Sequence, residues 1–209
     1  MRSKTETKRL AILRAAAEVF RAVGFERASM SDICARVGGS KATLYNYFPS
    51  KEKLFFEVMF QAKDVELEAI AAALNPDASD LKQELVRFGQ QFLRFAYEPQ
   101  SIAIRRLSIA QASQAGIGKM SYELTSVPTE KHVAGFLKKA MQRGALRAAD
   151  PKVAAMQLLS LFESEWLQRI LYGVVTSVKP QAIRASVRRA VDAFLAGYAV
   201  PAMPKASVA

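Results

Sequence analysis

The side chains best suited to binding chemistry lie in a short stretch, residues 41–48, whose spacing is that of an amphipathic helix. Its outward side carries a lysine, hydroxyls, an amide and tyrosine hydroxyls, which are groups that contact phosphates and the edges of bases. A merely solvated face would carry more Glu and longer side chains, although a small wet helical hairpin is the alternative interpretation. We expect these residues to contact double-stranded DNA: Ser29, Ser40, Lys41, Ala42, Thr43, Tyr45, Asn46, Tyr47 and Lys51.

Two short helices are expected to hold this face. The first is capped by Ser29 and ends at Gly38-Gly39, because glycine accepts the left-handed conformation of a tight turn. The second is capped by Ser40 and ends before Pro49. Two helices of this length joined by a short turn indicate a helix-turn-helix.

Over roughly residues 8–60 the chain closely resembles the N-terminal domain of TetR-family transcriptional regulators. The residues that carry the resemblance are Asp32-Ile33, Gly38, Ser40-Lys41, Thr43-Leu44-Tyr45, Tyr47-Phe48, Ser50-Lys51-Glu52 and Leu54. One departure is visible, since Val37 and Gly39 stand where the family usually has alanine and valine. A much weaker resemblance, to AefR-type members of the family, rests on Arg106-Leu107, Ile109-Ala110 and Arg143-Gly144 through Asp150-Pro151.

The charge distribution favours the same partner. The chain has 209 residues and a net charge of +11. Residues 1–51 contain ten Lys or Arg against four acids, a net of +6, so about half of the excess lies in the first quarter of the chain. A basic charge gathered around a helix-turn-helix favours DNA over a diffuse solubility charge.

The sequence predicts a cytoplasmic protein without catalytic, metal-binding or cofactor-binding residues. Charged residues recur through the first fourteen positions, and no apolar stretch reaches the length of about 18 residues of a membrane span. His132 is the only histidine, so no histidine cluster is available to bind a metal. Cys34 is the only cysteine; we interpret it as a small buried residue, with redox sensing as the alternative.

The apolar periodicity predicts an all-α fold of about nine helices, with no strand-like alternation. We expect a three-helix DNA-binding domain over residues 1–50, a helical effector-binding and dimerisation domain over 51–200, and a disordered tail over 201–209. A long helix that begins at Lys51 and ends near Leu74 is expected to link the two domains mechanically.

A homodimer is expected through residues 151–173 and 180–199. The first of these segments reads as one helix to Tyr172 that is apolar almost all round, so it must be buried on two sides. One side serves its own domain and the other needs a partner, which is also the arrangement that the family resemblance implies. A deeply buried helix in a monomer is the alternative.

The family resemblance also implies an effector pocket in the C-terminal domain. Candidate lining residues are Phe88, Phe92, Ile109, Tyr122, Phe136, Phe162 and Trp166, with polar contacts from Arg105, Arg106 and His132. The alternative is that these aromatic side chains simply fill the core.

We therefore expect a repressor that binds a palindromic operator as a dimer. A small apolar or aromatic effector, with or without an acid group, would release it. An effector-free architectural DNA-binding protein is the alternative function, and an enzyme that uses the same cavity is a distant third.

Overall fold

The structure, a computed structural model, describes residues 4–110, 112–113 and 117–200, without the side chains of residues 4, 59–66, 68 and 117. Within these residues the chain forms ten helices and no strand, so the predicted all-α fold is confirmed. None of the helices searched is both long and apolar enough to cross a membrane. The helices are α1 (Lys4–Arg27), α2 (Met30–Val37), α3 (Lys41–Tyr47), α4 (Lys51–Ala72), α5 (Leu81–Ala96), α6 (Pro99–Ala110), α7 (Ile117–Gln142), α8 (Pro151–Glu163), α9 (Leu167–Leu171) and α10 (Pro180–Tyr198).

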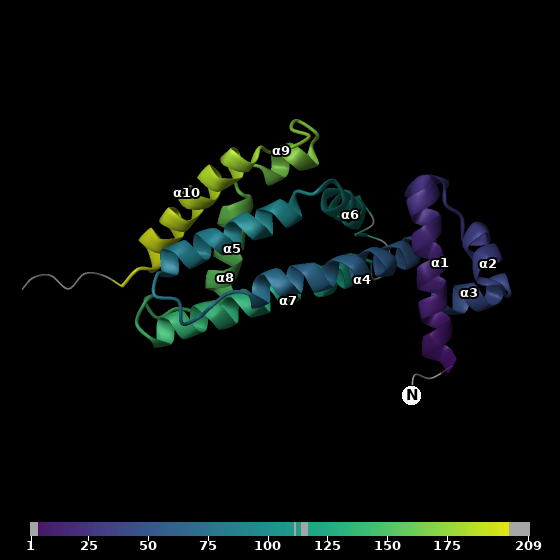
Figure 1. Ribbon diagram of the computed structural model, residues 1–209, viewed down its shortest axis with the longest axis horizontal. Helices are drawn as coiled ribbons and strands as arrows, with labels where there is room; N and C mark the ends of the chain where they lie inside the picture. The colour runs from purple at the N-terminus through teal and green to yellow at the C-terminus, as the bar shows by residue number, and fades with distance from the viewer. Residues whose placement is uncertain (1–3, 111, 114–116, 201–209) are drawn as a thin grey trace, which may run out of the picture.

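The molecule is elongated, with α1, α2 and α3 gathered at one end (Figure 1). Helix α4 packs against α1 there and then runs alongside α7 into the remainder of the chain. Helices α5, α7, α8 and α10 pack around a second core, which contains Phe88, Leu137, Leu158, Phe162 and Val187. The boundary between the two predicted domains therefore lies along a continuous helix, and the boundary itself stays a prediction.

The helix expected from residue 151 to Tyr172 is broken, and that prediction was wrong. Helix α8 ends at Glu163, and the short α9 begins at Leu167. Both the backbone N–H and the hydroxyl of Ser164 donate to Leu161 O, at 3.4 and 2.7 Å, so the helical turn tightens and stops. The tail over residues 201–209 lies outside the described residues.

Gly89 allows three helices of the second core to meet. A Cβ atom at this position of α5 would lie 2.6 Å from Cε1 of Phe162 on α8 and 2.8 Å from Cγ1 of Val187 on α10. Both neighbours are fully buried in the core, so neither has free space to move into. The absence of a side chain at residue 89 thus sets how closely α5 approaches its partners.

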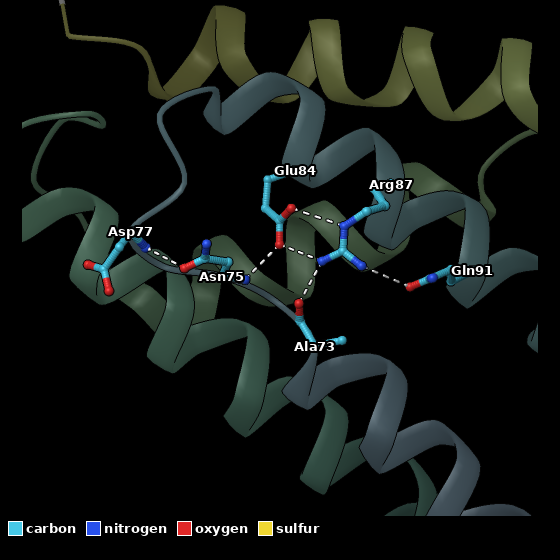
Figure 2. Close-up of polar contacts among 6 residues, drawn as sticks. All are labelled: Ala73, Asn75, Asp77, Glu84, Arg87 and Gln91. Carbon is cyan, nitrogen blue, oxygen red and sulfur yellow. Dashed lines mark hydrogen bonds and ion pairs between the residues drawn. The ribbon is translucent and has the colours of Figure 1, made fainter.

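A polar cluster fastens the C-terminal end of α4 to α5 (Figure 2). The carboxylate of Glu84, which is buried, accepts hydrogen bonds from the backbone N–H of Asn75 at 2.6 Å and from Nη2 of Arg87 at 2.6 Å. The same Nη2 donates to the carbonyl of Ala73 at 2.6 Å, just past the end of α4. We call Glu84, Arg87, Ala73 and Asn75 the α4–α5 latch.

Candidate nucleic-acid interface and cavity

Helices α2 and α3 form the predicted helix-turn-helix, anchored by buried apolar side chains. Ile33 on α2, Leu44 on α3 and Phe48 at the end of α3 are at most 3% exposed. They pack in one cluster with side chains of α1 and α4. This anchoring fixes α3 against α1 and leaves its opposite side toward solvent.

Serine caps begin both helices. The hydroxyl of Ser29 accepts from the backbone N–H of Asp32 at 3.2 Å, and the Asp32 carboxylate accepts from the N–H of Ser29 in return. At the start of α3, Ser40 Oγ accepts from the N–H of Thr43 at 3.1 Å. These predicted capping residues therefore set where the two helices begin.

The turn between the helices uses both glycines at positive φ, with φ 70° at Gly38 and φ 127° at Gly39. The second value explains the departure from the family pattern, because a valine would be strained in that conformation. The side chain of Lys8 on α1 donates to the carbonyl of Gly38 at 2.9 Å and so ties the turn to α1. Cys34 is buried beneath the turn, and its thiol lies 3.4 Å from the carbonyl of Gly39.

The outward face of α3 carries most of the predicted DNA-contacting side chains. Lys41, Ala42, Tyr45 and Asn46 are exposed, whereas Thr43 and Tyr47 are half-buried at the edges of the face. The cation and the amide thus lie on one solvent-facing surface. Their contact with DNA stays a prediction.

Lys51 has partners within the protein. Its ammonium group donates to the carbonyl of Phe25 at 2.9 Å and to that of Glu26 at 3.4 Å, and it lies 4.3 Å from the centre of the Phe25 ring. These carbonyls follow Gly24, whose non-helical φ of 76° interrupts α1 just before its end. Lys51 therefore fastens α4 to α1, and its predicted phosphate contact is untested.

A cavity of about 510 Å³ lies in the C-terminal part of the chain. Its wall comes from α5, α6, α7 and α8, together with Leu67 of α4. Of the side chains predicted to bind an effector, Phe92, Arg105, Ile109 and Tyr122 lie in this wall.

The other predicted aromatic side chains lie elsewhere. Phe88, Phe136 and Phe162 are buried in the second core, where the Phe88 and Phe162 ring centres are 6.0 Å apart. These three side chains fill the core, which was the alternative to a pocket. The close approach at Gly89 brings α5 and α8 together there. Trp166 caps α9 at its N-terminal end, and the guanidinium of Arg169 lies 5.2 Å from the Trp166 ring centre.

Two of the predicted polar residues also lie outside the wall. Arg106 donates to the carbonyls of Ile170 and Leu171, which end α9. The Nδ1 atom of His132 lies 2.9 Å from the carbonyl of Pro128, one turn earlier in α7. Both residues serve the helices rather than the cavity.

The polar part of the wall was largely missed by the sequence reasoning. Arg105 pairs with Glu163 on α8 at 2.6 Å, and the hydroxyls of Ser108, Ser121 and Thr125 lie nearby in the wall. The spacing of four residues between Ser121 and Thr125 was the available signal, because such residues share one face of a helix. Hydroxyls are common on helices, so the signal is weak.

Next to the ion pair lies Tyr97, at the end of α5. Burial raises the pKa of its phenol, and the negative charge of Glu163 raises that pKa further. The phenol therefore stays protonated, and its oxygen is buried without a hydrogen-bond partner among the described residues. The described residues contain no cluster of three or more potential metal ligands.

Family comparisons match two regions of the chain. A family described as "Bacterial regulatory proteins, tetR family" matches residues 12–58, and a family described as "AefR-like transcriptional repressor, C-terminal domain" matches residues 83–200. The two matches coincide with the helix-turn-helix end and with the part of the chain that holds the cavity.

Individual relatives agree with these families. The HTH-type transcriptional regulator RutR of Escherichia coli O157:H7 is 30% identical over 149 residues, which are 69% of this chain and 67% of RutR. A protein of Mesorhizobium loti MAFF303099, described as a TetR-family transcriptional regulator, has a similar structure with a TM-score of 0.79, 25% identity and coverage of 95% and 100% of the two chains. The Flavonoid-responsive Regulator FrrA is similar with a TM-score of 0.71, 31% identity and coverage of 94% and 99%.

Proposed function

The chain belongs to the TetR family of bacterial regulatory proteins and is a DNA-binding transcriptional regulator, and we propose that it is a homodimeric repressor released from a palindromic operator by a small molecule. Its relatives are regulators rather than enzymes. This function requires DNA binding, dimerisation and control by the effector, and each is assigned to a part of the chain.

DNA is contacted by the outward face of α3, with Asn46 at its centre and Lys41 in the first turn of the helix. What supports this assignment is that both side chains are exposed on a helix whose other side is buried. The lysine ammonium group forms an ion pair with a phosphate, and the asparagine amide matches the two hydrogen-bonding atoms on the edge of adenine. Ser29 and Ser40 already serve as helix caps, and the hydroxyl and backbone N–H of Ser29 both donate to Asp32, so Ser40 is the better phosphate donor of the two.

The dimer forms through α8 and α10. The support is apolar surface left exposed at Val153 on α8 (46%) and at Tyr172 just after α9 (84%). On α10 the outward residues include Ala185 and Ala193, which allow a second helix to approach closely. A twofold dimer sets its two recognition helices about 34 Å apart to meet successive turns of the major groove.

The single observation that carries effector control is a contact between the cavity and α4. Ile104 lines the cavity and packs against the fully buried Phe56 of α4. The neighbouring Phe55 ring meets Phe20 of α1 edge-on, with ring centres 4.9 Å apart. An effector that displaces α6 therefore moves α4 against α1 and changes the separation of the two α3 helices.

The effector is an aromatic compound. FrrA, which covers nearly the whole of this chain, is described as flavonoid-responsive, and its similarity favours an aromatic ligand here as well. To release DNA strongly, such a ligand must prefer the DNA-incompetent form by several kcal/mol, about 5 for a shift from one per cent to ninety-nine.

The experiment is selection of binding sites from random duplex DNA, followed by titration of the selected complex with small molecules. We expect a palindromic site, binding that weakens steeply with salt, and release by an aromatic compound. Binding with no sequence preference and no response to any compound would instead favour the architectural alternative. Mass spectrometry of small molecules that co-purify with the protein supplies the first candidates.

A further inference from the structure

The hydroxyls on α7 form a row along the cavity wall. Ser121, Thr125 and Thr129 follow one another at intervals of four residues, so they share one face of the helix, and all three line the cavity. The same wall also contains apolar side chains, among them Phe92 and Phe95. A ligand in this space thus meets apolar surface together with a line of oxygens.

Each hydroxyl in the row already donates its hydrogen to another atom of the protein. Thr125 donates to the carbonyl of Ser121 at 2.7 Å, and Thr129 donates to the carbonyl of Thr125 at 3.3 Å. Ser121 donates to the hydroxyl of Ser108 at 3.0 Å, which in turn donates to the carbonyl of Ile104 at 2.9 Å. A hydroxyl has one hydrogen and two lone pairs, so these oxygens are left as acceptors. They favour a ligand that brings O–H or N–H groups.

The one positive charge of the described wall is paired with a carboxylate, and the second carboxylate is held by a phenol. Arg105, the one basic residue among the described lining residues, is bound to Glu163 at 2.6 Å. The second carboxylate, Glu130, accepts the hydroxyl of Tyr122 at 3.1 Å. An anionic ligand beside this pair would meet the negative charges of Glu163 and Glu130, and it would gain little from a guanidinium whose charge Glu163 already offsets. The pairing therefore disfavours the acid group that the arginine alone had suggested.

One hydroxyl of the wall has its hydrogen free. Ser101 Oγ on α6 is buried and has no hydrogen-bond partner among the described residues. A buried polar atom without a partner costs free energy, so a ligand that supplies an acceptor there gains affinity. Because this oxygen has almost no accessible surface, a carbonyl or ether oxygen of a ligand reaches it only by displacing the side chains that cover it.

We propose that the cavity selects an uncharged aromatic compound that carries at least two hydroxyl donors and one carbonyl acceptor. Its donors bind the hydroxyl row of α7, its carbonyl accepts from Ser101, and its ring lies against Phe92 and Phe95. The paired Arg105 and Glu163 exclude carboxylates. This inference rests on the proposed function, because the compound it describes is the effector of that cycle.

The first test compares compounds that share one ring system. Apigenin, its trimethyl ether and a flavone carboxylate are titrated calorimetrically against the full chain. Apigenin should bind at least about tenfold more tightly than either of the others, which corresponds to one or two lost hydrogen bonds. Equal or tighter binding of the ether or of the carboxylate overturns the proposal, and so does the absence of binding by all three.

The second test removes single acceptors. Ser121→Ala and Thr125→Val should each weaken apigenin binding about fivefold to tenfold and leave the weak binding of the ether unchanged. Ser186→Ala is the matched control, since Ser186 is a buried serine on α10 that donates to a helix carbonyl away from the cavity. Equal loss in the control, or equal loss for the ether, would contradict a role for the row.

The third test reverses the charge preference. Glu163→Gln keeps the shape of the side chain but removes the negative charge that offsets Arg105, so the flavone carboxylate should gain at least about tenfold in affinity through a charge-assisted contact. No gain would show that the pair does not exclude anions and would overturn that part of the proposal. DNA binding without ligand is measured in parallel. If it persists while the compound preferences fail, only the inference on the ligand fails; if it is absent, the proposed function fails.

Discussion

At the scale of single residues, α3 separates the side chains that hold the fold from those that face outward. Leu44 and Phe48 are buried within the N-terminal core, while Asn46 is exposed between them. A substitution of Asn46 therefore removes no packing. The change in DNA affinity that the substitution causes can therefore be measured without a correction for lost stability of the fold.

We predict that Asn46→Ala relaxes base preference at one position of each half-site. The cost for the preferred base is about 1–3 kcal/mol, the value of a bidentate amide contact. Lys41→Met should instead weaken all sequences about equally and reduce the salt dependence, because a phosphate contact carries no sequence information. Fluorescence anisotropy on a panel of single-base operator variants measures both effects.

The control for the lysine is Lys138→Met, an exposed lysine on α7 remote from α3. It should leave both the affinity and the salt slope unchanged. If Asn46→Ala and Lys41→Met also bind the whole panel as the parent protein does, α3 is not the surface that reads DNA.

The residue types that the sequence located correctly are those with a local cause. Ser29 and Ser40 cap helices because capping depends on neighbours in the chain, and spacing alone shows this. The cavity wall was harder, because a wall residue is defined by helices that meet across long separations. Arg105 faces Glu163 across 58 positions, and no local pattern distinguishes it from Arg106, which caps α9 instead.

At the scale of elements, the latch fixes one end of α4 while the cavity acts on its middle. Glu84 in the latch is buried, and its hydrogen bond with Arg87 is the main reason that its pKa lies below the usual value. A carboxylate with a lowered pKa stabilises the fold above its unfolded pKa of about 4.3, and this contribution is lost as the pH falls through the folded value.

We predict that Glu84→Gln lowers the free energy of unfolding by about 1–2 kcal/mol at neutral pH, an amount reduced by the solvent exposure of Arg87. The difference between the variant and the parent should begin to shrink as the pH falls below the unfolded pKa, and it should disappear as the pH falls through the lowered folded pKa of Glu84. Urea unfolding at a series of pH values measures this difference in the free energy of unfolding. Glu123→Gln is the control, because Glu123 forms an exposed pair with Lys119 at 3.7 Å that should contribute little. A difference that stays constant with pH would exclude the ionised latch as its cause.

The contact between Ile104 and Phe56 gives a separate prediction for the coupling of the elements. Phe56→Leu keeps an apolar side chain in the site but shortens its reach toward α6. We expect DNA binding to remain, effector binding to remain, and the effector-induced loss of DNA affinity to fall by about 0.5–2 kcal/mol. Anisotropy of the DNA complex with and without the effector measures this coupling.

Its control is Phe95→Leu, which lies in the cavity wall, so it should weaken effector binding itself. Unchanged release by the effector in Phe56→Leu would place the coupling elsewhere in the chain.

Element boundaries were predictable where glycine, proline or a cap marks them, and not elsewhere. Gly38 ends α2 and Pro49 follows the end of α3, as the sequence indicates. The break between α8 and α9 has no such marker: its hydrogen bonds from Ser164 to Leu161 are local, but Ser164 is one serine among many and nothing in the sequence distinguishes it.

At the scale of the whole molecule, the proposed dimer needs a surface that a single protomer leaves uncovered. Ala190 on α10 is buried in the protomer's own core, so a charge there would unfold the subunit rather than separate two of them. Ala193, three residues on, is exposed on the outer side of the same helix. It is the better position for a substitution that blocks association alone.

We predict that Ala193→Arg yields a folded monomer, because a long charged side chain prevents the close approach of two α10 helices while leaving the protomer's packing intact. Light scattering at micromolar concentration should report half the parent mass, and helicity by circular dichroism should be unchanged. The matched control is Ala103→Arg, at an exposed alanine on α6, which should remain dimeric. The variant monomer should also bind one half-site with far lower affinity than the parent binds the palindrome, since the two half-sites no longer act together. If light scattering shows that the parent protein is monomeric, the proposed dimer is wrong. If the Ala193→Arg variant stays dimeric, the interface does not include the outer face of α10.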